Sequence, residues 1–153
     1  MSEPVNAIPE GYEGVTPYII CKNAEAAIEF YKKAFGAVEL FRIGEPGMVG
    51  HAELKIGGAI IMLADEHPEM GALSPESVGG TPVTLMIYVK DVDDFTEKAI
   101  AEGLKVLKPV MDQFYGDRSG YFQDPFGHQW SFATHIENVS PEEMNQKAKE
   151  MYG

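Results

Sequence analysis

The ionisable side chains best placed to do chemistry are a histidine and a glutamate separated by one residue, His51 and Glu53. On an extended strand this spacing puts both side chains on the same face of the sheet. Such a pair could bind a divalent metal ion, or it could act as an acid and a base. The alternative is a plain hydrogen-bonded pair at the rim of a pocket. We favour this alternative because most such pairs are structural.

A second group combines a guanidinium with aromatic rings. Arg118 lies between Tyr115 and Tyr121 and shortly after a glycine, in a segment expected to form a loop. An arginine in this setting can stack on a flat ligand or pair with its acid group. The competing interpretation is an ion pair with Asp117 or with a glutamate, which would hold the loop in place.

The sequence shows no sign of other catalytic arrangements. No Ser-His-Asp or Cys-His combination and no phosphate-binding glycine loop can be recognised. The single cysteine, Cys21, excludes an intrachain disulfide. It ends an apolar segment, so we expect a small buried side chain rather than a reactive thiol.

The elements that would position these residues come from an internal repeat. The segment 16–23, followed by a helical pattern, returns as 84–91 with a second helical pattern, and 50–58 is echoed by 120–127. Two copies are too few for a solenoid. We therefore expect an α+β fold in which two tandem βαβββ modules form one cupped, mostly antiparallel sheet.

Local signals divide the chain further. Asn23 and Gly36 bound a helix at 24–35, and Asp91 precedes a second helix beginning at Val92. Ser140 opens a capping box for a last helix. Strands are expected at 15–21, 39–43, 51–56 and 59–64, and again at 83–89, 104–109, 120–123 and 129–133. The resulting plan is an N-terminal arm at 1–14, a first module at 15–64, a linker without periodicity at 65–82, a second module at 83–137 and a C-terminal helix at 138–153.

Charge and hydropathy limit the partners. The chain has 24 acidic and 12 basic residues, a formal net charge of −12. This charge repels phosphate groups, so we expect no nucleic-acid partner and no membrane partner. The N-terminus lacks the pattern of a signal peptide, and no apolar run reaches the length of a membrane span, which together predict a cytoplasmic protein.

Two motifs resemble a known superfamily. Glu-Phe-Tyr-Lys-Lys-Ala-Phe-Gly at 29–36 and Asp-Pro-Phe-Gly-His at 124–128 are similar to segments of the vicinal oxygen chelate superfamily, which includes glyoxalase I, extradiol dioxygenases and bleomycin-binding proteins. The segments 51–54, 62–65 and 112–118 resemble its PhnB-like branch. The resemblance runs from about Val15 to His135. It implies paired βαβββ modules around a single cup, and it makes a homodimer the expected assembly.

The resemblance also implies where a metal would bind. Enzymes of the superfamily use up to four ligands from the first and last strands of each module, and these positions fall at Thr16, Met62, Thr84 and Ser131. Hydroxyls and a thioether do not replace the carboxylate, imidazole or thiolate that such ions require. We therefore expect no metal at these positions and no cofactor.

The predicted function is metal-independent binding of a small apolar or aromatic molecule in the cup. One alternative is a lyase, dioxygenase or transferase of the superfamily with a metal relocated to His51 and Glu53, or with none. Another is a degenerate interaction module whose pocket is filled by methionine and tyrosine. Met62 and Met86 could correspondingly fill a closed core instead of forming an adaptable pocket wall. The identity of the ligand, and whether any reaction occurs, stay open. The candidate ligand-binding residues are Thr16, Tyr18, His51, Met62, Thr84, Met86, Tyr88, Tyr115, Arg118, Tyr121, Gln129 and Ser131.

Overall fold

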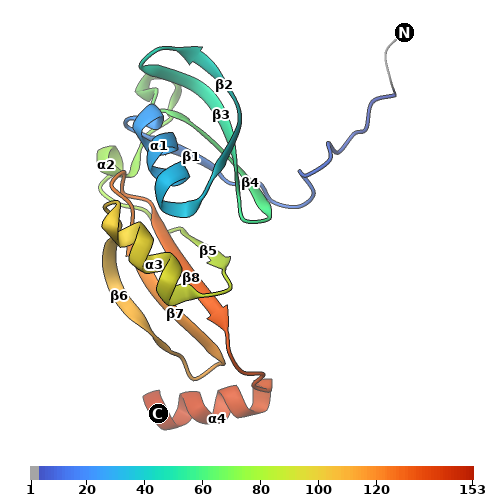
Figure 1. Ribbon diagram of the computed structural model, residues 1–153, viewed down its shortest axis with the longest axis vertical. Helices are drawn as coiled ribbons and strands as arrows, with labels where there is room; N and C mark the ends of the chain where they lie inside the picture. The colour runs from blue at the N-terminus through green and yellow to red at the C-terminus, as the bar shows by residue number, and fades with distance from the viewer. Residues whose placement is uncertain (1–3) are drawn as a thin grey trace. The chain divides into compact units, whose positions relative to one another are not determined.

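The computed structural model describes residues 4–153, so the first three residues of the predicted arm lie outside it. The chain divides into two compact units, one ending at Val78 and the other beginning at Gly79. Each unit contains a four-stranded mixed sheet and a helix that packs on it (Figure 1). This architecture confirms the α+β prediction. The joining of the two sheets into one cup stays a prediction.

The first unit follows the predicted order of strand, helix and three strands. It consists of β1 (Tyr18–Cys21), α1 (Ala24–Phe35), β2 (Val38–Glu45), β3 (Met48–Ile56) and β4 (Ala59–Asp65). The strand order in the sheet is β1-β4-β3-β2, where β1 runs parallel to β4 and the other pairs are antiparallel. Every strand of this unit was expected, although β1 begins later and β2 and β3 are longer than the sequence suggested.

Helix α1 has the bounds that the sequence predicts. The Asn23 side chain accepts a hydrogen bond from the backbone N–H of Ala26, and Gly36 ends the helix in the left-handed conformation at φ 69°. Its N-terminus is also tied to the sheet, because the Asp65 carboxylate accepts from the N–H of Ala24 at 2.7 Å and from that of Val49 at 2.7 Å. A single carboxylate thus fixes the helix against β3 and β4.

The segment after β4 is more ordered than predicted. It contains the 3₁₀ helix η1 (Pro68–Met70) and the one-turn helix α2 (Pro75–Val78). The Glu66 carboxylate accepts from the backbone N–H of Ser74 and from the hydroxyl of Ser77, which closes this loop on itself. The absence of periodicity in the sequence therefore did not mean an absence of local structure.

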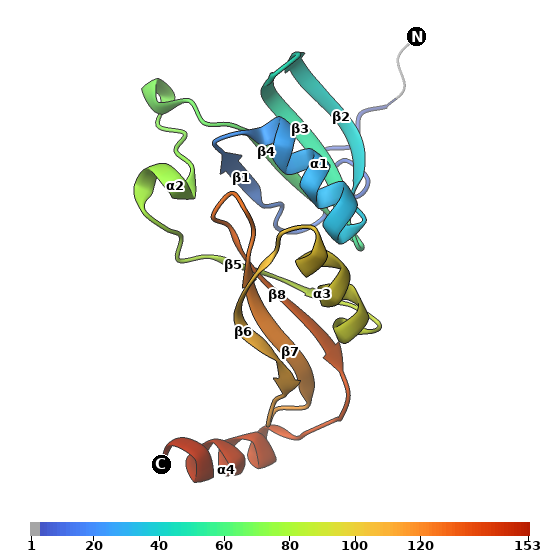
Figure 2. The same ribbon diagram turned by 60° about the vertical axis from the view of Figure 1, so that its left-hand side comes forward.

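The second unit repeats the arrangement. Its sheet contains β5 (Thr84–Tyr88), β6 (Lys105–Asp112), β7 (Asp117–Gln123) and β8 (Gln129–His135) in the order β5-β8-β7-β6. Strand β5 runs parallel to β8, and the other pairs are antiparallel. Helix α3 (Val92–Ala101) covers one face of this sheet (Figure 2).

The core of the second unit lies between α3 and the sheet. Phe95 of the helix contacts Phe132, with ring centroids 4.8 Å apart, and Phe132 stacks on the buried Trp130. Trp130 and Phe132 thus pack under the helix. The Asp-Pro-Phe-Gly turn supports the same core: the Asp124 carboxylate accepts from the backbone N–H groups of Phe126 and His128 and from the Trp130 indole at 2.9 Å.

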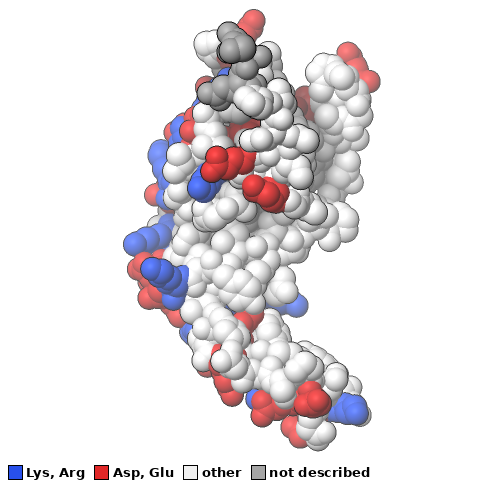
Figure 3. Space-filling view, turned by 90° about the vertical axis from the view of Figure 1, so that its right-hand side faces the viewer, with Lys and Arg blue, Asp and Glu red and all other residues white. Residues whose placement is uncertain are grey.

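Helix α4 (Pro141–Tyr152) ends the chain. The Ser140 hydroxyl accepts from the N–H of Glu143 at 3.2 Å, as the capping box predicts, and no residue of the helix is buried. Acidic and basic side chains share its surface, at the lower end of Figure 3. Within residues 4–153, no helix has the length and apolar character needed to cross a membrane.

Candidate functional site

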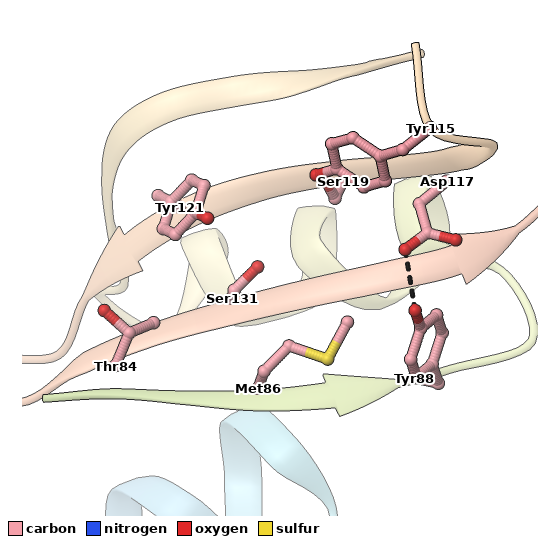
Figure 4. A pocket seen from close by; sticks show the side chains of 8 residues that line it. All are labelled: Thr84, Met86, Tyr88, Tyr115, Asp117, Ser119, Tyr121 and Ser131. Carbon is pink, nitrogen blue, oxygen red and sulfur yellow. Dashed lines mark hydrogen bonds between the residues drawn. The ribbon is translucent and has the colours of Figure 1, made fainter. Parts of the chain in front are cut away.

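The second unit has a pocket on the face of its sheet that lies opposite α3. Strands β5, β7 and β8 form its floor and walls, and its volume is about 410 Å³ (Figure 4). Side chains alternate between the two faces of a strand, so β7 sends Phe122 to the helix and its odd-numbered residues to the pocket. The residues that line the pocket are Thr84, Met86, Tyr88, Tyr115, Asp117, Ser119, Tyr121 and Ser131.

Half of the eight residues that line the pocket are apolar or aromatic. Met86 and Tyr88 project from β5 and Tyr121 projects from β7, and all three are exposed. Three hydroxyls are already engaged: that of Ser131 donates to the carbonyl of Gly120 at 3.1 Å, and the hydroxyl oxygens of Tyr115 and Ser119 lie 3.4 Å apart. The pocket therefore offers aromatic rings and a thioether to a ligand, together with hydroxyls and one carboxylate.

One lining residue carries a charge. The Asp117 side chain accepts a hydrogen bond from the Tyr88 hydroxyl at 2.7 Å, and its other oxygen lies 2.9 Å from Nδ1 of His135. These bonds raise the pKa of the Tyr88 phenol and raise the pKa of His135 above its ordinary value of 6.5. Asp117 itself is only 5% exposed. The pocket thus contains a buried carboxylate held by two partners.

Asp117 is not among the candidate ligand-binding residues that the sequence suggests. The sequence suggests Asp117 only as a partner for Arg118, in a segment expected to be a loop. The signal that could have identified it is its spacing, because Asp117, Ser119 and Tyr121 alternate along one strand face. Extending the predicted strand toward its N-terminus would have brought the carboxylate into the pocket.

A glycine holds the pocket wall in position. Gly116 has φ 101°, and its carbonyl accepts from the N–H groups of Ile136 and Glu137. A Cβ at this position would lie 2.2 Å from the Glu137 carbonyl oxygen. This close approach joins the loop before β7 to the segment after β8, and it places Tyr115 and Asp117 on either side of the contact.

Arg118 is used elsewhere. Its guanidinium pairs with the Asp93 carboxylate of α3, through bonds of 2.7 and 3.0 Å, and with Asp112 at 3.0 Å. The predicted pairing with Asp117 is wrong, because successive side chains of β7 point to opposite faces of the sheet. Arg118 does not line the pocket, and neither does Gln129, which lies opposite Thr84 in the register of β5 and β8.

The first unit holds the other candidates. Nε2 of His51 lies 2.7 Å from the Glu53 carboxylate, and Nδ1 of His51 lies 2.9 Å from the Tyr18 hydroxyl. The Tyr12 hydroxyl donates to the second oxygen of Glu53. Burial opposes ionisation of Glu53, but the bonds from Tyr12 and His51 outweigh it and lower its pKa. His51 and Glu53 are thus the hydrogen-bonded pair that we favoured from the sequence.

In the part of the chain that the structure describes, neither unit brings together enough His, Cys, Asp or Glu side chains to form a metal site. Thr84 and Ser131 belong to the pocket of the second unit, and Met62 lies beside Tyr18 in the register of β1 and β4. Thr16 precedes β1. Within residues 4–153, no three His, Cys, Asp or Glu side chains gather closely enough to hold a metal ion. The donor chemistry at the four superfamily positions therefore does not fit a tightly bound divalent metal.

Comparison with known proteins gives consistent matches. A model of the Glyoxalase/Bleomycin resistance protein/Dioxygenase superfamily matches residues 15–132. The uncharacterized protein Mb0911c of Mycobacterium bovis is 42% identical over 134 residues, which cover 85% of this chain and 88% of that protein.

Solved structures show the same fold. TioX from Micromonospora sp. ML1 has a TM-score of 0.65 and 25% identity, over 80% of this chain and 100% of TioX. The fosfomycin resistance protein FosX from Listeria monocytogenes, solved with Mn(II) and sulfate, has a TM-score of 0.61 and 21% identity, over 88% of this chain and 97% of FosX. The family model spans most of both units. The chain therefore belongs to the Glyoxalase/Bleomycin resistance protein/Dioxygenase superfamily.

Proposed function

We propose that this protein binds a small, flat organic molecule in the pocket of the second unit, without a metal ion. The observation that carries the proposal is the pocket itself: about 410 Å³ of space beside Met86 and three tyrosine rings. Ligand sites are usually concave, mostly apolar and about 300–1,000 Å³ in volume, with a few polar groups that orient the ligand. An aromatic molecule would be held by burial and by contacts with the tyrosine rings.

The donor set argues for metal-independent binding. The FosX structure contains Mn(II). In this chain, two of the four positions that correspond to the superfamily's metal ligands line the pocket, Thr84 and Ser131, and both offer only neutral hydroxyls. The Ser131 hydroxyl is moreover directed to the Gly120 carbonyl. Divalent metals of catalytic sites generally need three protein ligands that are carboxylate, imidazole or thiolate. We therefore do not extend a metal-dependent activity to this chain.

The alternative of an enzyme centred on His51 and Glu53 has less support. The two side chains bond to each other, and each also bonds to a tyrosine. A relocated metal would therefore have two protein ligands instead of three.

Assignment to the PhnB-like branch rests on the sequence segments 51–54, 62–65 and 112–118. That assignment and the cytoplasmic location stay predictions.

Acridine, a flat neutral fluorophore, tests the proposed function. Titration of the purified protein should show saturable binding that Met86→Lys weakens at least about tenfold, because the ligand would have to bury an ammonium group. Met70→Lys is the matched control, since Met70 is 80% exposed and does not line the pocket. Equal binding by both variants and the wild-type protein would refute a site beside Met86.

A further inference from the structure

We infer that Asp117 makes this pocket selective for aromatic cations, with the charged nitrogen of the ligand bound at the carboxylate. This inference rests on the proposed function, since it names the class of molecule that the pocket of the second unit would take. The carboxylate lies at one end of the pocket, beside Tyr88 and Tyr115, and Met86 and Ser131 occupy its middle (Figure 4).

The carboxylate has capacity for another donor. An ionised carboxylate can accept about four hydrogen bonds. Two donors, the Tyr88 hydroxyl and Nδ1 of His135, are in contact with Asp117. Both partners also fix the orientation of the side chain before a ligand arrives. A protonated nitrogen of the ligand would add a charge-assisted hydrogen bond to Asp117, a residue that is only 5% exposed.

The charges around the pocket favour a cation over an anion. None of the eight lining residues is a lysine, an arginine or a histidine. Outside the lining, Nδ1 of His135 lies 2.9 Å from Asp117, so a protonated His135 is the basic group with which a ligand cation would compete. Arg118, the next residue along β7, is held by Asp93 and Asp112 on the opposite face. Lys108 lies over the Tyr121 ring, 5.4 Å from its centroid, but Tyr121 is four residues from Asp117, about 13 Å along an extended strand.

The rings add a second attraction for a cation. Tyr88 and Tyr115 lie at the end of the pocket that holds Asp117, and Tyr121 lies toward its other end. The face of a tyrosine ring carries partial negative charge and attracts a flat cation in addition to the contact area it provides. Carboxylate and rings therefore favour the same class of molecule, a flat aromatic amine that is protonated at neutral pH.

A pair of probes with the same ring system separates this inference from the proposed function. 9-Aminoacridine is cationic and acridine is neutral at about pH 8, where less protonated His135 competes for Asp117 than at lower pH. Fluorescence titration should show that 9-aminoacridine binds at least about tenfold tighter than acridine, the effect expected of one charge-assisted bond. Asp117→Asn should reduce this ratio to about twofold or less.

Controls address the overall charge and the fold. Asp94→Asn removes the same charge from an exposed ion pair on α3 and should leave the ratio unchanged. The wild-type ratio should also persist in 1 M salt, where screening acts beyond about 3 Å, because the contact is buried. If Asp117→Asn does not fold, the affinity ratio of the wild-type protein in 1 M salt tests the inference. Equal affinities for the two probes would overturn the inference and leave the proposed function standing, whereas no binding of either probe would overturn both.

Discussion

At the scale of single residues, four buried or half-buried carboxylates organise the two units. Asp65 ties α1 to β3 and β4, Asp124 closes the turn before β8, Glu53 bonds to Tyr12 and His51, and Asp117 enters the pocket. Among the described residues, no buried side-chain nitrogen or oxygen lacks a hydrogen-bond partner. Buried carboxylates are costly unless they are bonded in this way, so each should be sensitive to substitution.

The Asp124→Ala substitution tests the structural role most simply. It would leave the Trp130 indole N–H and the N–H groups of Phe126 and His128 without their acceptor. We expect the free energy of unfolding to fall by at least about 3 kcal/mol, measured by chemical denaturation, because each buried donor left unpaired costs about 1–3 kcal/mol. Asp94→Ala, at an exposed ion pair, should change it by less than about 0.5 kcal/mol. Similar values for the two variants would show that the turn does not depend on this carboxylate.

The His135–Asp117 pair predicts a dependence on pH. Hydrogen bonds to Asp117 and then to Asn138 raise the pKa of His135 above 6.5. The stabilisation from the protonated pair is therefore fully present below pH 6.5 and is lost as pH rises through the pKa of the folded protein. NMR titration of the imidazole should show the raised pKa, and Asp117→Asn should return it toward 6.5. An unchanged pKa in the variant would contradict the assignment of Asp117 as its main cause.

At the scale of elements, the loop before β7 decides the shape of the pocket. Gly116→Ala places a methyl group against the Glu137 carbonyl and imposes a left-handed backbone on alanine. We expect a loss of about 1–3 kcal/mol in stability and weaker acridine binding, because Tyr115 and Asp117 flank the strained position.

Gly14→Ala is the control for backbone strain alone. Gly14 has φ 82°, but a Cβ there meets nothing within 4 Å. Gly14→Ala should therefore lower the free energy of unfolding by less than Gly116→Ala does, and it should leave acridine binding intact. Equal losses in the two variants would mean that the contact with Glu137 does not matter.

The same elements show how far the sequence could lead. Helix α1 was predicted to the residue because Asn23 and Gly36 are strong local signals. The start of β7 was missed because Asp117, Arg118 and Ser119 have low strand propensity, and it is their pairing with β8 that makes them a strand. Six candidate residues line the pocket: Thr84, Met86, Tyr88, Tyr115, Tyr121 and Ser131.

The misassignment of Arg118 has a related cause. Its partner Asp93 lies 25 residues earlier, on a helix that crosses the sheet. Only the packing of α3 on the face opposite the pocket brings the two side chains together. Local patterns in the sequence contain no information about such a pairing. Arg118 could therefore be excluded from the candidate site only once the fold was known.

At the scale of the whole molecule, we propose a homodimer, as the superfamily resemblance implies. The sheets of both units expose large apolar side chains, among them Tyr18, Phe41 and Met86. Such surfaces commonly mark interaction sites. Sedimentation equilibrium at micromolar concentration should give twice the mass of 16.8 kDa. A monomer under these conditions would refute the proposal.

The most direct test of the central claim places a ligand against Met86. The protein contains eight methionines, so ¹³C-methyl labelling gives few NMR signals, and Met86→Leu assigns the one that matters. Titration with acridine should move the Met86 methyl resonance through the ring current of the bound probe, while the exposed Met70 and Met151 stay fixed. Saturable acridine binding with an unmoved Met86 resonance would contradict a ligand site in the pocket of the second unit.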